Sequence, residues 1–399
     1  MKRRSLGMSP WFLVLTLAAP SVEAATEACG LCHPEQRVEH EAGIHIAEGV
    51  GCVDCHGGDG ASRDVDGAHR GRFRGPDDRG TIPKMCAECH SDLELMRPYN
   101  LPVDQYAVYT TSQHGRRVAA GDLRAAVCTD CHGAHQIRDT EDPRSPTHPR
   151  NLAATCGTCH SDEVMMKDFD LSSQIVAQYG RGVHGLALEG GNQAAPDCTS
   201  CHGTHGSAPP GLGDVDKVCG ACHQRTRRAF LEGAHYAGML AAGLPECASC
   251  HDEHEVVSFD AEAVGSLCAE CHSGESEAVQ LSEKLYTLIE EAEESLDRAA
   301  QLVVEGERRA LEVEDYKSRI EEGRTYVTEA LTLVHTVAIE PVAELTNRAH
   351  ALGEEVRHEL YAKMDKRPAH VGLALFWFYV VLTAIVLVTL KKQGRGGSS

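Results

Sequence analysis

The eighteen cysteines of this 399-residue chain all follow one spacing rule, and none is left over. They form nine pairs with two residues between the partners, and a histidine follows each pair at once. In chain order, the nine Cys-x-x-Cys-His motifs are motif 1 to motif 9. The pairs are Cys29/Cys32, Cys52/Cys55, Cys86/Cys89, Cys128/Cys131, Cys156/Cys159, Cys198/Cys201, Cys219/Cys222, Cys247/Cys250 and Cys268/Cys271. The histidines are His33, His56, His90, His132, His160, His202, His223, His251 and His272.

Covalent chemistry explains this spacing. Two thiols three positions apart can bond to the two vinyl groups along one edge of a haem, and the adjacent histidine then reaches the iron as its proximal ligand. Disulfides and zinc ribbons also use cysteine pairs, but neither requires a histidine after every pair. The sequence therefore predicts nine covalently attached haem c groups.

Further histidines are available as sixth ligands of the nine irons. Methionine, which raises the potential of a c-type haem, is scarce in this region, so the sequence predicts bis-histidine ligation and low potentials. Ten histidines other than those of the motifs lie between Cys29 and His272: His40, His45, His69, His114, His135, His148, His184, His205, His235 and His254.

Most of these histidines recur at fixed places. One leading motif is followed by four modules of two motifs each, which pair motifs 2 and 3, 4 and 5, 6 and 7, and 8 and 9. An upstream histidine precedes the later modules by fourteen, fourteen and twelve residues: His114, His184 and His235. A loop histidine lies three residues after the first motif histidine of the same modules: His135, His205 and His254.

The first two-motif module departs from this pattern. Asp59 stands where a loop histidine is expected, His69 follows later, and His40 or His45 is the upstream histidine. His40, His45 and His69 would supply a sixth ligand to three irons, and the later modules would supply one to six more. The total is nine, and His148 is spare. A loop histidine such as His135 is too close to His132 to bind the same iron, so we expect it to bind a neighbouring one. The alternative is a loop histidine that bonds to haem propionates.

The stretches "YTTSQHGRR…AVCTDCHGAHQI" and "YGRGVHGLA…PDCTSCHGTHG" resemble the repeats of multihaem c-type cytochromes of anaerobic respiration, which are related to class III cytochromes c. The resemblance extends from about Cys29 to His272. It implies periplasmic electron transfer through bis-histidine haems, with His114, His184 and His235 as distal ligands.

Composition and periodicity predict a mainly α fold with much irregular loop. Only 5% of residues are aromatic, so we expect the haems themselves to fill the interior of residues 25–274. Residues 275–368 show apolar side chains every three or four positions and predict a long helical hairpin or bundle that breaks near Gly306. This region is expected to be a stalk and is a candidate dimer interface. A further helix is expected from Pro341 towards the membrane.

The two ends of the chain predict export and anchoring. Residues 1–24 have the basic start, short apolar core and small-residue end of a signal peptide, with an uncleaved anchor as the alternative. Residues 369–392 contain an uncharged stretch from Val371 to Leu390, long enough to span a bilayer. The sequence thus predicts a single-pass protein on the periplasmic face of the bacterial inner membrane, with a cytoplasmic tail at 393–399.

The most economical function is an electron relay between quinol-linked membrane complexes and periplasmic or outer redox partners, with a quinol-oxidising membrane subunit as one candidate partner. The formal charge of -21 argues against nucleic-acid binding. The alternative is a reductase or oxidoreductase of nitrite or hydroxylamine type, which keeps one iron open. Tyr99, Tyr106, Tyr109, Tyr179 and Tyr236 are then candidates for a cross-link to haem. No motif carries lysine in place of its histidine, so an electron-transfer protein without catalytic residues is favoured.

Overall fold

The computed structural model describes residues 27–75, 79–211, 214–365 and 369–394. Within these ranges the chain forms helices and loops and no strand, which confirms the predicted fold class. The chain divides into two compact units at Pro210/Gly211, a boundary between motifs 6 and 7 and inside the segment predicted as one haem domain. The predicted signal peptide lies outside the described residues.

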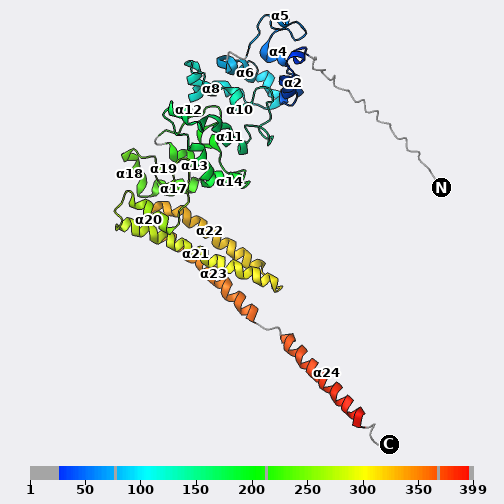
Figure 1. Ribbon diagram of the computed structural model, residues 1–399. Helices are drawn as coiled ribbons and strands as arrows, with labels where there is room; N and C mark the ends of the chain where they lie inside the picture. The colour runs from blue at the N-terminus through cyan, green and yellow to red at the C-terminus, as the bar shows by residue number, and fades with distance from the viewer. Residues whose placement is uncertain (1–26, 76–78, 212–213, 366–368, 395–399) are drawn as a thin grey trace, which may run out of the picture. The chain divides into compact units, whose positions relative to one another are not determined.

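The first unit consists of short helices joined by irregular loops (Figure 1). Its α-helices are α1 (Cys29–Cys32), α2 (Pro34–Glu41), α3 (Ile44–Ala47), α4 (Cys52–His56), α5 (Val65–Ala68), α6 (Ile82–His90), α7 (Leu93–Met96), α8 (Gln105–Thr111), α9 (Gln113–Ala119), α10 (Cys128–His132), α11 (Pro149–His160), α12 (Glu163–Lys167), α13 (Ile175–Arg181), α14 (Val183–Glu189) and α15 (Cys198–His202). Two 3₁₀ turns, η1 (Arg79–Thr81) and η2 (Arg97–Tyr99), complete it.

The second unit combines short helices with long ones. The short helices are α16 (Val215–Gly220), α17 (Gln224–Glu232), α18 (His235–Ala242), α19 (Ala248–His251) and α20 (Ala261–Ala269). The long helices are α21 (Glu277–Arg308), α22 (Glu314–Leu333), α23 (Ile339–Asp365) and α24 (Ala369–Gly394), and the 3₁₀ turn η3 (Val334–Thr336) joins α22 to α23.

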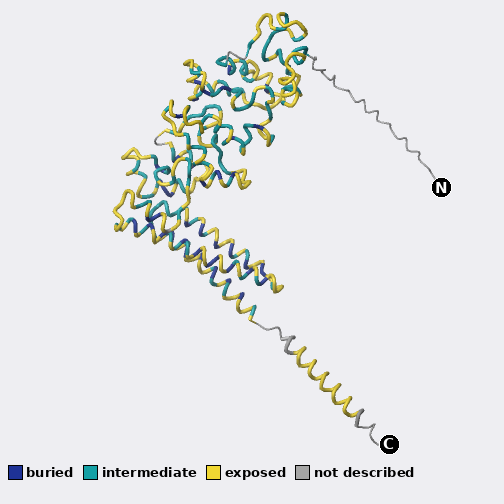
Figure 2. The backbone as a smooth tube through the Cα atoms, viewed as in Figure 1, coloured by how far each residue is buried: buried dark blue, intermediate teal, exposed yellow. Residues whose placement is uncertain are grey.

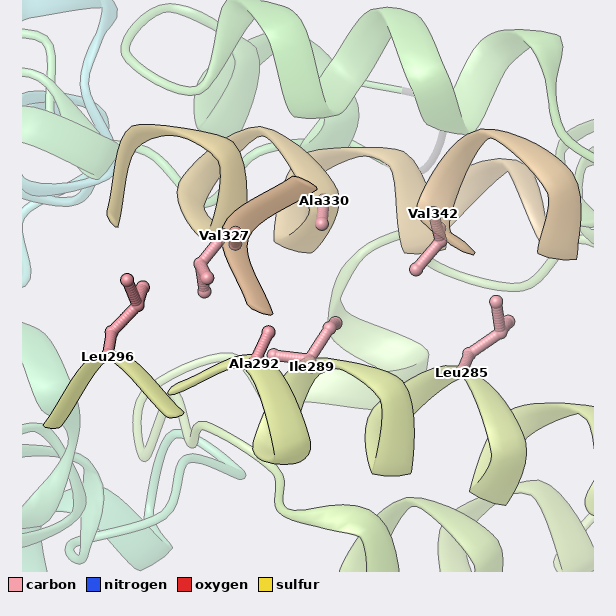
Figure 3. Close-up of a cluster of buried hydrophobic side chains, with 8 residues drawn as sticks. Leu285, Ile289, Ala292, Leu296, Val327, Ala330 and Val342 are labelled. Carbon is pink, nitrogen blue, oxygen red and sulfur yellow. The ribbon is translucent and has the colours of Figure 1, made fainter. Parts of the chain in front are cut away.

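Helices α21, α22 and α23 form a three-helix bundle, which confirms the predicted hairpin or bundle. The side chain of Ser276 caps α21 by accepting a hydrogen bond from the Val279 amide. The break after Arg308 falls two residues beyond the predicted Gly306. Figure 3 shows Leu296 of α21 near Val327 of α22, and Leu285 of α21 opposite Val342 of α23, across the bundle core.

Burial differs sharply between the bundle and the motif-bearing segments. Buried residues line the inner faces of α21 to α23, whereas most residues around the motifs are only partly buried or exposed (Figure 2). Leu296 and Leu360 are 1% and 0% exposed. The bundle therefore has an ordinary apolar core, while side chains alone bury little of the motif-bearing segments.

Helix α24 carries the predicted span. Residues Leu373–Lys391 have a mean hydropathy of 2.5, and none of their side chains is buried in the protein. A 26-residue helix is about 39 Å long, enough to cross a bilayer. The chain thus has one C-terminal apolar helix suited to membrane insertion.

Candidate functional site

Seven of the nine motif histidines face a second histidine at nearly the same separation. The distance between ring centroids lies between 6.1 and 6.3 Å in every pair. The pairs are His33–His69, His90–His45, His56–His135, His160–His114, His132–His205, His272–His235 and His251–His335.

This separation fits a metal ion between two imidazole rings. A ring nitrogen lies about 1.1 Å from the centroid of the five-membered imidazole ring. It binds a first-row metal at about 2 Å, so two trans imidazoles have centroids about 6.3 Å apart. A direct N–H···N hydrogen bond would bring the centroids to about 5.2 Å. The residues present therefore fit a six-coordinate haem iron.

The pairs fall into two geometric classes that follow the sequence repeat. Where the second motif of a module pairs with its upstream histidine, the ring planes are inclined by 53–56°: His45–His90, His114–His160 and His235–His272. Where the pair contains the histidine of the first motif of a module, the angle between the ring planes is only 17–31°: His56–His135, His132–His205 and His251–His335. The leading motif differs from both, with 73° between His33 and His69.

In the first unit, the loop histidines His135 and His205 pair with the preceding module and not with their own. His135, from the second module, faces His56 of the first module. His205, from the third module, faces His132 of the second. His69, from the first module, likewise faces His33 of the leading motif. Within the first unit, a histidine thus joins each module to the motif or module before it.

A kink between two short helices presents the upstream histidine His114. Ser112 ends α8 and caps α9, and its hydroxyl accepts a hydrogen bond from the Gly115 amide. A Cβ atom on Gly115 would lie 2.1 Å from the Tyr109 carbonyl oxygen, so only glycine fits directly after the histidine. The Tyr109 hydroxyl in turn donates to the Ala126 carbonyl at 2.8 Å, two residues before motif 4.

The next module repeats this arrangement around His184. A Cβ on Gly185 would again lie 2.1 Å from a tyrosine carbonyl oxygen, that of Tyr179. The Tyr179 hydroxyl donates to the Pro196 carbonyl at 2.9 Å, which precedes motif 6 by the same two residues. The tyrosine therefore ties the helix that carries the upstream histidine to the start of the following motif.

Hydrogen bonds to backbone carbonyls fix the tautomer of three motif histidines. Nδ1 of His56 lies 2.9 Å from the Arg74 carbonyl oxygen, Nδ1 of His202 lies 3.2 Å from that of Ala208, and Nδ1 of His251 lies 3.0 Å from that of Val257. A carbonyl only accepts, so each Nδ1 carries the proton and donates. Nε2 of the neutral ring is left as the metal-binding atom.

Burial keeps several of the paired rings neutral. Loss of hydration is the largest effect at six of them, and it lowers the pKa of His45, His90, His114, His132, His160 and His205. Only an unprotonated nitrogen can bind a metal, so this environment favours the ligating form.

The cysteines place neighbouring motifs side by side. None of the eighteen, all within the described residues, forms a disulfide. Between modules, the first thiols of consecutive motifs lie within electrostatic range of each other: Cys29 with Cys52, Cys86 with Cys128, Cys156 with Cys198, and Cys219 with Cys247. Within modules, thiols lie within electrostatic range of each other: Cys55 with Cys89, Cys131 with Cys156, and Cys250 with Cys268. In each unit the motifs therefore follow one another in space in their sequence order.

Several motif thiols are exposed to solvent. Cys201 lies in α15, whereas Cys222 and Cys271 lie in the turns that follow α16 and α20. The short motif helices offer few side chains to cover these positions. Haem attachment at these cysteines stays a prediction. The exposed cysteines are Cys32, Cys89, Cys201, Cys219, Cys222, Cys250 and Cys271.

The remaining predicted site residues take other positions. His40 is engaged through Nε2 with the Val50 carbonyl oxygen at 2.9 Å, and it faces no motif histidine at the separation of the pairs. The spare His148 caps α11, where its side chain accepts from the Arg150 amide. His184 lies in α14 as His114 lies in α9, and His254 follows motif 8 in a loop. His335, which lies in the region predicted as a helical bundle, was not among the predicted ligands.

Comparison with known families agrees with this geometry. Residues 44–161 match the model described as cytochrome c3, and residues 191–228 match the model described as a doubled CXXCH motif. These two segments contain motifs 2 to 7. No similar curated protein and no similar solved structure were found. The chain is a multihaem c-type cytochrome that holds covalently bound haem c, transfers electrons, and carries an apolar C-terminal helix suited to a membrane anchor.

Proposed function

We propose that the protein is a membrane-anchored periplasmic cytochrome with nine haem c groups, and that it relays electrons between quinol-linked membrane complexes and periplasmic or outer redox partners. The observation that carries the proposal is the common separation of 6.1–6.3 Å between paired histidine rings. Ring pairs at this distance hold iron six-coordinate, which suits electron transfer without substrate binding.

The proposed ligand set follows the repeat. The eighteen motif cysteines attach the haems, and the nine motif histidines are the proximal ligands. Eight sixth ligands come from the upstream histidines His45, His114, His184 and His235 and the later histidines His69, His135, His205 and His254. His40 and His148 are left out of the set because their ring nitrogens bond to the backbone.

The contacts between motifs support a continuous route through each unit. Haem iron accepts and releases single electrons as it changes between the ferric and ferrous states. The chain contributes the spacing: its cysteines hold consecutive attachment points next to each other, and loop histidines join each module to the one before. Neutral bis-histidine ligation favours low potentials, which suit electrons derived from anaerobic respiration.

The membrane attachment supports the proposed location. Helix α24 is the candidate span, and an exported body with a short inner tail agrees with the signal-like N-terminus. The 27 residues of α23 run about 40 Å from the turn at η3 to Asp365. An electron donor at the Asp365 end of α23 is therefore far from the motif next to η3, which favours a separate quinol-oxidising partner.

The enzyme alternative finds less support. Seven motif histidines already face a second ring. Two of the candidate cross-linking tyrosines, Tyr109 and Tyr179, donate their hydroxyl groups to backbone carbonyls. These contacts give both tyrosines a structural role that is repeated from one module to the next.

Turnover and topology test the proposal. The detergent-solubilised holoprotein is mixed with nitrite or hydroxylamine and an excess of reduced methyl viologen, and oxidation of the viologen is followed by absorbance. We expect slow, stoichiometric oxidation without turnover, and sustained turnover would support the enzyme instead. In spheroplasts, added protease should remove the haem-staining domain. Protection of that domain from protease would contradict the periplasmic location.

A further inference from the structure

The last module lacks one histidine that the leading motif and the first two modules obtain from their successors. In the first unit, each loop histidine faces the first motif histidine of the preceding module or of the leading motif: His69 faces His33, His135 faces His56, and His205 faces His132. Motifs 8 and 9 form the final module, so no further module follows to supply a partner for His251. The repeat alone leaves the iron of motif 8 without a sixth ligand.

The helical bundle supplies a histidine at this position. His335 lies in η3, between α22 and α23, and its ring centroid is 6.2 Å from that of His251. The planes are inclined by 25°, between the 17° of His132–His205 and the 31° of His56–His135. We infer that His335 is the sixth ligand of the iron held by motif 8, so that the bundle is a ligand-bearing part of the haem domain. This inference rests on the proposed bis-histidine scheme.

A hydrogen bond from Nδ1 to a backbone carbonyl oxygen orients each ring of the pair. Nδ1 of His335 donates to the Thr332 carbonyl oxygen at 3.1 Å, and Nδ1 of His251 donates to the Val257 carbonyl oxygen at 3.0 Å. Each ring therefore keeps Nε2 as its unprotonated nitrogen. The Phe259 ring, 5.2 Å from that of His251, adds an apolar contact on the motif side.

The backbone around His335 is held in an uncommon conformation. Val337, which ends the turn, has a φ of +55°, a region that is unfavourable for a β-branched residue. Thr336 steadies the turn because its hydroxyl donates to the Leu333 carbonyl at 2.7 Å. Strain of this kind persists where the surrounding structure fixes it, and functional positions are common among such sites.

Helix α17 closes tightly on the same turn. A Cβ atom on Gly233, the residue after α17, would lie 2.4 Å from the His335 carbonyl oxygen. Arg225 of α17 also pairs with Glu329 of α22 at 3.0 Å. The segment before motif 8 is thus packed directly against the element that carries His335, which holds the two rings at a fixed separation.

Two other histidines of the bundle provide the contrast. His350 and His358, both on α23, are exposed, as expected of ordinary surface histidines. His335 is instead partly buried and directed at a motif histidine. The bundle therefore places this histidine, unlike those two, where an iron ligand is required.

Carbon monoxide binding to the full-length reduced holoprotein tests the inference. We expect none in the unaltered protein, one carbon monoxide per chain in His335→Ala, and none in the matched control His350→Ala. Added imidazole should abolish carbon monoxide binding in His335→Gly, because it replaces the lost ring. A folded His335→Ala protein that binds no carbon monoxide would overturn the inference and leave the proposed function intact.

Two further outcomes distinguish a failure of this inference from a failure of the proposed function. If the unaltered protein already binds carbon monoxide, the bis-histidine scheme of the proposed function fails first. If His335→Ala accumulates poorly, His335→Met keeps a sixth ligand and should raise the potential of one haem in a redox titration. A titration curve unchanged from that of the unaltered protein would overturn the role of His335.

Discussion

Replacing His205 by alanine should open one iron and leave the others unchanged. Its ring centroid is 6.1 Å from that of His132. Subtracting about 1.1 Å for each ring leaves roughly 3.9 Å between the facing nitrogens, or two metal–nitrogen bonds of about 2 Å. An alanine side chain ends at Cβ and cannot reach the iron, so one haem becomes five-coordinate while the remaining ones stay low-spin.

The assay is carbon monoxide titration of the reduced protein, combined with electron paramagnetic resonance of the oxidised protein. The expected stoichiometry is one carbon monoxide per chain, with loss of one low-spin signal from the class of nearly parallel rings. His114→Ala should likewise open one iron, but from the class inclined by 53–56°. His148→Ala is the control and should open none. An unchanged His205→Ala protein, or an identical effect of His148→Ala, would refute the pairing.

Three other predictions concern packing and charge. Gly185→Ala places a Cβ 2.1 Å from the Tyr179 carbonyl oxygen and should destabilise the protein by about 1–3 kcal/mol in thermal unfolding. At Gly180, where a Cβ would meet no other atom, alanine should leave the stability unchanged or raise it by about 0.5–1 kcal/mol. Equal effects of the two substitutions would contradict the kink. Leu360 is 0% exposed, so Leu360→Ala should lower the stability of the bundle to denaturant by about 2–5 kcal/mol. Tyr361 is 56% exposed, so Tyr361→Ala should change that stability by no more than about 0.5 kcal/mol. Similar losses from the two substitutions would argue against the bundle core. Because the formal charge is -21, reduction by a cationic small donor should slow on the order of tenfold from low to high salt in stopped-flow measurements, and a rate that does not depend on salt would count against electrostatic steering.

The motifs and the helical bundle were predictable because their signals are local. A cysteine pair with its adjacent histidine needs no tertiary information, and the apolar periodicity of residues 275–368 predicts helices directly. The spacing of loop histidines also indicated that His135 binds an iron other than that of His132, and the structure accordingly places it 6.3 Å from His56.

The ninth distal histidine that we propose, His335, was not predictable in this way. A count of histidines near the motifs reached nine by including His40, whose Nε2 bonds to the Val50 carbonyl. His335 lies 84 residues after His251, in a region whose pattern indicates only helices. A signal was nevertheless present, because a repeat in which each module serves its predecessor must leave the last module short of one ligand.

Ligation of the unaltered holoprotein tests the central claim most directly. Haem is counted by pyridine haemochrome, low- and high-spin signals are recorded on the oxidised protein, and carbon monoxide is added to the reduced form. The account predicts nine haems per chain, all low-spin and all indifferent to carbon monoxide. Fewer than nine haems, or a single high-spin haem that binds carbon monoxide, would contradict it.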